Sequence, residues 1–389
     1  MTRFVSKGVF VALAFSFAGS ALAADDPFLW LEERTGDKAL AWVAEQNART
    51  AAELRSDPRY EDYVDAAVGL FTATDNLAYG YVQGDHVYNF WQDGEHNLGL
   101  WRRTTPASYK SAAPEWETIM DFDALAAAEG VDWVFSNATC APPDYQRCLI
   151  SLSPDGGDAV EVREFDLSTK SFVNDGFFSP VSKSDLAWFD PDSVILSPAY
   201  SEDQVTSSGY SRIVKLWKRG TPTEAETLFE GDVEDGWVLA YIAWDGEHHD
   251  LILDRGLDFY RTEFHVRLPD GSLKRIPLPE DAVIQQHFDG QLVFSPRSDW
   301  TLPDGRTLQA GGLYSFDFRR WLHDGELGTI DVLIEPTAKT AIVSTARTKD
   351  RLFVSSGSRS LWRSPTMATS PSAIPIRTAP RSHSASPIS

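Results

Sequence analysis

The chain has 389 residues, 24% of them charged and 12% aromatic, and a formal net charge of −22. This composition is typical of a packed globular protein and excludes a wholly disordered chain. So strong a negative charge repels phosphate backbones, and we therefore expect no nucleic acid partner. A chain of this length can form two domains or one large all-β domain.

Residues 1–23 have the pattern of a secretory signal peptide. Arg3 and Lys7 provide a basic start, residues 8–17 form a short apolar run, and residues 21–23 (Ala-Leu-Ala) offer a small-residue cleavage site. The alternative is a membrane anchor, but the apolar run is too short to span a bilayer comfortably. We therefore predict a periplasmic or secreted protein that has no membrane contact after cleavage.

Residues 24–69 form the next segment, which we predict to be helical. A run of good helix formers extends from Lys38 to Arg55, and Asp57-Pro58 is a turn sequence that ends it. Its apolar residues recur at spacings that place them near one face of a helix: Leu40, Val43, Ala44, Ala51 and Leu54. A second, much shorter helix is predicted over Asp121–Glu129.

Residues 70–363 have the pattern of short strands joined by tight turns. Nine Asp-Gly pairs, which supply the positive φ that two-residue hairpin turns need, punctuate this region. Residues 262–268 alternate polar and apolar side chains, as does a strand with one buried face. With almost no helix between strands, a parallel α/β sheet is disfavoured, which leaves a sandwich, a barrel or a propeller. At roughly 40–50 residues per four-stranded blade, the region suits a propeller of about six or seven blades.

Cys140 and Cys148 are the two cysteines of the chain, and they flank a turn-forming run at residues 141–144 (Ala-Pro-Pro-Asp). In an exported protein, a pair this close is expected to form a disulfide; the alternative is two buried free thiols. We expect no zinc site here, because no nearby histidine pair completes a set of four ligands.

Residues 364–389 differ abruptly from what precedes them. They contain seven Ser and five Pro, and no acidic residue, glycine or aromatic residue. One reading is a disordered linker. The other, which we favour, is a reading-frame shift near Arg363, because the change follows directly on the strand-like residues 360–363.

Several motifs resemble the prolyl oligopeptidase family. Residues 26–33 (DPFLWLEE) resemble its D-P-Y-x-W-L-E-[DE] opening, and residues 41–47 (AWVAEQN) resemble its W-V-x-x-Q-N helix. Further on, residues 88–94 and 100–103 resemble the first blade of the family. Residues 163–167, 208–212 and 215–220 resemble a bacterial exported branch of it. The likeness covers about residues 25–363.

The resemblance implies an all-β fold: a seven-bladed, possibly incomplete β-propeller over residues 70–363, with a short N-terminal helical segment. In this family an α/β-hydrolase domain follows the propeller, carries the Ser-Asp-His triad and packs against the N-terminal segment. We expect this chain to lack that domain. Members are serine endopeptidases that cleave short peptides after proline, so short proline-containing peptides would be substrates if the hydrolase domain were present. No cofactor is implied.

The catalytic residues of such a hydrolase are not found in the sequence. Its nucleophile needs a G-x-S-x-G turn, and no window matches. The nearest is residues 209–213, where Ile213 replaces the second glycine, so we expect Ser211 to be structural. Residues 356–358 (Ser-Gly-Ser) are predicted to be a turn.

Histidines and paired carboxylates offer no better candidates. Five histidines adjoin Asp-Gly turns and are expected to be solvated surface residues: His96, His248, His249, His287 and His323. A metal site at His248-His249-Asp250 is disfavoured, because adjacent residues on a strand point to opposite faces. Asp190 and Asp192 are expected to be solvated loop residues. We therefore predict no catalytic, cofactor-binding or metal-binding residue in this chain.

Two functions remain open. One is the substrate-gating propeller of a prolyl oligopeptidase, inactive in this form; the other is a free-standing propeller used as a binding or scaffold module. The helix at Lys38–Arg55 distinguishes them. In a self-sufficient propeller its apolar face should be covered by the propeller, whereas in the family it rests on the hydrolase and would be left exposed here.

Overall fold

The computed structural model describes residues 26–33, 35–154, 156–221, 226–246, 248–348, 350–358 and 370–374. The predicted signal peptide lies outside these residues, as does all of the predicted tail except 370–374. The chain divides into two compact units, Met1–Ala73 and Thr74–Ser389.

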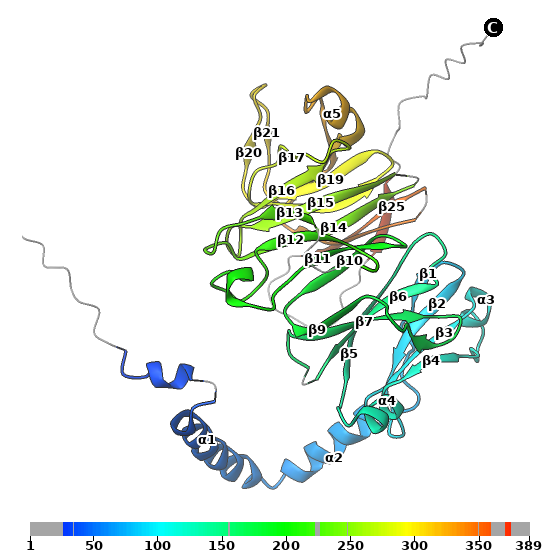
Figure 1. Cartoon of the computed structure of the whole chain (residues 1–389), viewed down its shortest axis with the longest axis vertical. Coiled ribbons are helices and arrows are strands. Elements are labelled where there is room, and N and C mark those ends of the chain that lie inside the picture. The colour runs from blue at the N-terminus through cyan, green and yellow to red at the C-terminus, as the bar shows by residue number, and fades with distance from the viewer. Residues whose placement is uncertain are drawn as a thin grey trace, which may run out of the picture. The chain divides into compact units, whose positions relative to one another are not determined.

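The first unit is helical (Figure 1). It contains a 3-10 turn η1 (Leu29–Glu32) and two helices, α1 (Asp37–Arg55) and α2 (Tyr60–Phe71). The structure confirms the predicted helix at α1, which ends two residues before Asp57. The Asp57 carboxylate accepts a hydrogen bond from the Arg59 backbone N–H at 2.9 Å in the turn that follows.

Helix α2 lies mostly within the segment predicted to be helical, residues 24–69, but was not predicted as a separate helix. Its apolar residues Tyr63, Val64, Val68 and Phe71 do recur at helical spacing, but all four are exposed. Burial is scarce throughout this unit, since Ala39 is the one buried residue of α1 and α2 has none.

The second unit consists of antiparallel sheets that follow one another along the chain. The first three contain these strands: β1 (Tyr81–Gln83), β2 (His86–Trp91), β3 (Leu100–Thr104) and β4 (Glu117–Asp121); β5 (Val134–Cys140), β6 (Arg147–Ser153), β7 (Val160–Asp166), β8 (Ser171–Phe172) and β9 (Phe178–Ser182); β10 (Asp185–Asp190), β11 (Ser193–Ser197), β12 (Ile213–Lys218) and β13 (Glu226–Glu230).

The next three sheets contain β14 (Trp237–Asp245), β15 (His248–Gly256), β16 (Thr262–Arg267) and β17 (Leu273–Arg275); β18 (Ala282–Phe288), β19 (Gln291–Pro296), β22 (Leu313–Asp317) and β23 (Ile330–Ile334); and β24 (Thr340–Arg347), β25 (Leu352–Ser358) and β26 (Ser370–Ile374). A small hairpin, β20 (Trp300–Thr301) and β21 (Thr307–Leu308), extends from the fifth sheet. The short helices are α3 (Pro106–Tyr109), α4 (Phe122–Glu129), α5 (Phe318–Asp324) and η2 (Glu202–Gln204). Helix α4 confirms the short helix predicted from Asp121.

These sheets are the blades of a β-propeller, which confirms the predicted fold class. Within each sheet the strands pair in or close to chain order, and the first strands of neighbouring sheets lie side by side: β5 with β10, β10 with β14, β14 with β18 and β18 with β24. Six such blades lie among the described residues. All strand pairs described are antiparallel, so no parallel α/β sheet occurs in this part of the chain.

Two parts of the last blade differ from what the sequence predicts. Residues 356–358 are not a turn but the end of β25, because Ser356 pairs with Ile342 of β24 and extends that ladder. Within the tail, Ser370–Ile374 pairs with β25 as β26. Whether the tail arises from a frame shift stays a prediction.

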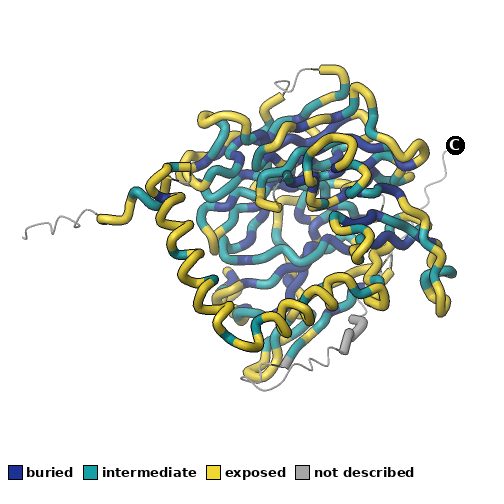
Figure 2. Tube along the Cα trace, turned by 90° about the horizontal axis from the view of Figure 1, so that it is seen from below, coloured by how far each residue is buried: buried dark blue, intermediate teal, exposed yellow. Residues whose placement is uncertain are grey.

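The core lies between neighbouring blades, and the inner blades are buried on both faces. Figure 2 shows the buried residues recurring along the strands. Adjacent residues of a strand point to opposite faces and therefore join different clusters. In four strands one residue packs towards the preceding or following blade and its neighbour packs the other way: Leu149 and Ile150 in β6, Val194 and Ile195 in β11, Ile252 and Leu253 in β15, Leu292 and Val293 in β19.

The propeller has two faces, which the strand directions define. The turn between the first and second strands of each blade lies on one face, which we call the turn face; the turn between the third and fourth strands lies there too. Two neighbouring first turns meet on it, since the Asp245 carboxylate accepts hydrogen bonds from the backbone N–H groups of Asp289 and Gly290 at 2.8 and 2.7 Å.

Candidate functional site

Ser211, the serine nearest to the nucleophile motif, does not have the position of a nucleophile. Ser211 is fully buried, and its Oγ donates to the carbonyl of Ile213 at 2.9 Å and accepts from the N–H of the same residue at 3.1 Å. It lies in a loop before β12 rather than at a strand-to-helix turn. The predicted structural role of Ser211 therefore agrees with its contacts.

Four of the five turn-associated histidines lie at or near the surface. His248 and His249 are exposed, His323 is 88% exposed beside Asp324, and His96 is partly exposed, with Nδ1 3.0 Å from Asp93 Oδ1. Asp190 and Asp192 are exposed as expected. Within the described residues, no group of three or more His, Cys, Asp or Glu side chains could hold a metal ion.

His287 is the exception, and the prediction of a solvated residue was wrong. The side chain lies on β18, is only 7% exposed, and packs edge-on against Phe318 of α5 with ring centroids 5.3 Å apart. Its burial arises because α5 and the Asp245 side chain of the neighbouring blade cover the turn that follows it. Neither ring nitrogen has a hydrogen-bond partner, and burial lowers the pKa of His287 to about 4.

Cys140 and Cys148 lie on the turn face as well. They are direct cross-strand partners of β5 and β6, and the structure joins them in a disulfide that closes the turn between these strands. The bond ties the two strands together at one end and leaves no free cysteine among the described residues.

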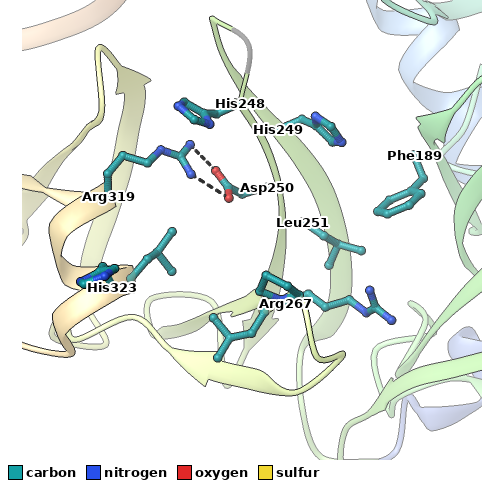
Figure 3. A pocket seen from close by; sticks show the side chains of 11 residues that line it. Phe189, His248, His249, Asp250, Leu251, Arg267, Arg319 and His323 are labelled. Carbon is teal, nitrogen blue, oxygen red and sulfur yellow. Dashed lines mark hydrogen bonds and ion pairs between the residues drawn. The ribbon is translucent and has the colours of Figure 1, made fainter. Parts of the chain in front are cut away.

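A cavity of about 480 Å³ opens at the turn face (Figure 3). Three consecutive blades contribute to it: the third through Phe189 at the end of β10, the fourth through β15 and β16, and the fifth through α5. Its remaining lining residues are His248, His249, Asp250, Leu251, Arg267, Leu268, Pro269, Arg319, Leu322 and His323.

One wall of this pocket is an ion pair between two blades. The guanidinium of Arg319 donates to both carboxylate oxygens of Asp250, with distances of 3.0 and 2.5 Å (Figure 3). The two charges compensate each other in a bidentate arrangement. This wall is therefore polar but electrically neutral.

The opposite part of the pocket carries a cation with little compensation. The side chain of Arg267 is 23% exposed and its Nε is buried without a hydrogen-bond partner. Its one ion-pair contact in the described part of the chain is Nη2 to Glu226 Oε1 at 3.5 Å. Glu226 is 51% exposed, so water screens this contact. Figure 3 shows the Arg267 guanidinium, His249 and Leu251 on the side of the pocket that Phe189 occupies.

The sequence had pointed to parts of this pocket without uniting them. It marked His248, His249 and His323 as turn residues and considered Asp250 only in a disfavoured metal site, but it missed Phe189, Arg267 and Arg319. No local pattern could have found these three, because the pocket draws on residues 189 to 323 through packing of separate blades. No helix in the described part of the chain is long and apolar enough to cross a membrane.

Comparison with known proteins identifies related sequences. A family model described as "Prolyl oligopeptidase, N-terminal beta-propeller domain" matches residues 16–368. The uncharacterized peptidase y4nA of Sinorhizobium fredii is 39% identical over 341 residues, covering 85% of this chain and 47% of the relative. An uncharacterized peptidase of Rickettsia prowazekii is 31% identical over 340 residues, covering 84% and 47%. The chain thus spans about half the length of the curated relatives it matches.

Solved structures give the same result. The structure of a post-proline cleaving enzyme from Rickettsia typhi aligns with a TM-score of 0.77 and 27% sequence identity, over 87% of this chain and 53% of that enzyme. A structure from a study of two prolyl endopeptidases aligns with a TM-score of 0.64 at 11% identity, over 85% of this chain and 47% of the other, which shows a shared fold.

Proposed function

We propose, because this chain belongs to the prolyl oligopeptidase family and forms its N-terminal β-propeller domain, that it is the substrate-gating part of a serine peptidase that cleaves short peptides after proline. The observation that carries this proposal is the family match over residues 16–368. The likeness to the post-proline cleaving enzyme of Rickettsia typhi supports the substrate class. In this role the propeller admits short peptides to a catalytic domain and excludes folded proteins.

We propose further that the described residues hydrolyse no peptide by themselves. The serine nearest to the nucleophile motif, Ser211, is buried, and its hydroxyl is engaged with the backbone of Ile213. Hydrolysis would then require a catalytic domain of the kind that the rest of such relatives provides.

The helical unit leaves an apolar face of α1 uncovered by its own residues. Leu40, Val43 and Leu54, which share the apolar face of α1, are 50%, 42% and 56% exposed. An apolar face of this kind calls for a protein surface that covers it. We propose that this surface belongs to the catalytic domain.

Export to the periplasm also stays a proposal, supported by the pattern of residues 1–23. A fusion of residues 1–40 to alkaline phosphatase that lacks its own leader should be active in the periplasm of a bacterial host. The same fusion with residues 8–17 replaced by a polar sequence is the control. Equal activity of the two fusions would contradict export through this segment.

Catalysis can be tested on the mature chain, residues 24–389. We expect no turnover of a Gly-Pro fluorogenic peptide and no labelling by a serine-directed fluorophosphonate. The post-proline cleaving enzyme from Rickettsia typhi serves as the positive control. Stoichiometric labelling of the chain would show that a reactive serine had been overlooked.

Gating can be tested in a hybrid. Residues 74–358 would replace the aligned propeller segment of peptidase y4nA, and cleavage of a short Gly-Pro peptide would be compared with cleavage of casein. We expect the hybrid to cleave the peptide and to spare casein, as does a hydrolase covered by a propeller. A hybrid that degrades casein as readily as the peptide would contradict a gating role.

A further inference from the structure

We propose that the turn-face pocket binds the free C-terminal carboxylate of a short peptide whose last side chain is apolar. The inference rests on the proposed function only for the choice of peptides as the ligand class. The site itself is inferred from the charges, the burial and the shape of the pocket.

Arg267 supplies the first argument. A guanidinium that is mostly buried has lost much of its hydration and needs an anion in return. Among the described residues its one ion pair is with Glu226, at 3.5 Å, longer than a well-formed hydrogen bond, and that carboxylate is itself half exposed. The exposed carboxylate of Asp270 interacts with Arg267 only through its charge. The Arg267 guanidinium therefore retains donors for an incoming carboxylate, which a planar fork of N–H groups suits.

The charge balance of the lining supplies the second argument. Arg319 and Asp250 neutralise each other, so Arg267 gives the residues that line the pocket one net positive charge before any imidazole is counted. The carboxylates that face Arg267, those of Glu226 and Asp270, are exposed and lie outside this lining. His248 and His249 add ring N–H groups at the rim. The whole chain carries a formal charge of −22, so a cationic pocket opposes its overall composition. A locally positive site on a negatively charged protein attracts an anion that the surrounding surface repels.

The apolar lining gives the ligand its second feature. Phe189, Leu251 and Leu322 come from three different blades and line the pocket together with the charged groups. Phe189 lies on the same side as the Arg267 guanidinium (Figure 3). A volume of about 480 Å³ falls within the usual range for small-molecule sites. A carboxylate attached directly to a carbon that carries an apolar side chain meets these conditions, and a peptide C-terminus has that chemistry.

The position favours a peptide as the source of the carboxylate. The pocket lies on the turn face, where the first turns of the blades meet, and the proposed function brings short peptides to the propeller. A fatty-acid carboxylate shares the anionic and apolar features but lacks the backbone N–H and C=O groups that His248 and His249 can bond. The two sources are separated by experiment.

The test is a calorimetric titration of the mature chain with acetyl-Gly-Pro-Leu as the free acid and as the C-terminal amide. We expect the acid to bind roughly ten-fold or more tightly than the amide, as the loss of a charge-assisted hydrogen bond implies. Octanoate is titrated in parallel and should bind more weakly than the peptide acid. Equal affinity of acid and amide, or no binding of either at millimolar concentration, would overturn the proposal.

Matched variants locate the site. R267Q should abolish the preference for the acid, while R261Q should keep it. Arg261 lies in the β15–β16 loop on the opposite face of the same blade, is 54% exposed and pairs with Asp258. Each variant removes one positive charge, so a general charge effect would weaken binding of the peptide acid equally in both variants. That outcome would also overturn the proposal. If R267Q fails to fold, the comparison of acid, amide and octanoate on the unaltered chain still decides.

The two proposals can fail separately. If the unaltered chain binds the peptide acid and the amide equally, the pocket assignment is refuted. The hybrid peptidase test of gating is not affected by that result. Binding of octanoate in place of the peptide acid would likewise refute a peptide ligand without touching the gating role.

Discussion

The helical unit and the propeller use apolar residues in opposite ways. Of the 19 residues of α1 only Ala39 is buried, and α2 has no buried residue. In the propeller, adjacent residues of one strand enter different core clusters, so each inner blade is buried on both faces. The comparison shows that the blades stabilise one another, whereas the helices have little within their own unit to hold them.

The largest expected effect is on the isolated helical segment. A fragment of residues 26–73 should lose most of its helical signal, because isolated helices of this length are marginal in water without packing. Circular dichroism at 222 nm measures this. The complementary fragment, residues 74–389, should keep its strand spectrum. A fragment 26–73 that is as helical in isolation as in the structure would remove the contrast between the two units.

A matched pair of tryptophan substitutions sharpens the same contrast. Trp101 has no exposed surface and packs between Tyr88 and Phe165, whereas Trp42 of α1 is 42% exposed. We expect W101A to lower the free energy of unfolding by about 3–5 kcal/mol. W42A should lower it by less than about 1 kcal/mol. Urea unfolding of both variants provides the measurement, and equal losses would contradict the assignment of the core.

A further expected effect, no larger than that of W101A, concerns the acid stability of the propeller. Burial lowers the pKa of His287 from 6.5 to about 4, with the carboxylates of Asp245 and Asp250 and the guanidiniums of Arg319 and Arg347 as its charged neighbours. Since the folded chain holds the neutral ring, the unfolded chain takes up the proton first as the pH falls. The contribution of His287 to the free energy of unfolding is therefore fully present above about pH 6.5. It is lost as the pH falls from 6.5 to 4, by roughly 3 kcal/mol at pH 4.

The variant H287F tests this contribution, because it should fit beside Phe318 and remove the titrating group. The free energy of unfolding should fall less between pH 7.5 and 4.5 in H287F than in the unaltered chain. H323N, which alters an exposed histidine, is the control and should leave the pH dependence unchanged. Identical slopes in all three proteins would show that His287 does not titrate in this way.

Much of the fold could be predicted from local sequence. The period-two alternation at residues 262–268 corresponds to β16, and the helical run at Lys38–Arg55 corresponds to α1. Helix α2 was not predicted as a separate helix despite its helical spacing, and residues 356–358 were taken for a turn although they continue β25. In both segments the sequence pattern is short or weak. Their secondary structure is then decided by strand pairing or by the neighbouring chain.

The site was harder to predict than the fold. The histidine turns gave His248, His249 and His323, which do line the pocket, but nothing local indicated Arg267 or Phe189. His287 was expected on the surface because it precedes an Asp-Gly turn. That turn lies under Asp245 of the neighbouring blade, a contact that spans more than 40 residues of sequence.

The sequence by itself determined the family, the strand-and-turn pattern and the position of the first helix, because these depend on motifs and on spacing between near neighbours. It also placed Cys140 and Cys148 on either side of one tight turn. Only the tertiary structure decided which charges are buried, which are paired and which residues meet in the turn-face pocket. The reason is physical: burial and pairing are properties of the contact between blades, and residues far apart in the chain make that contact.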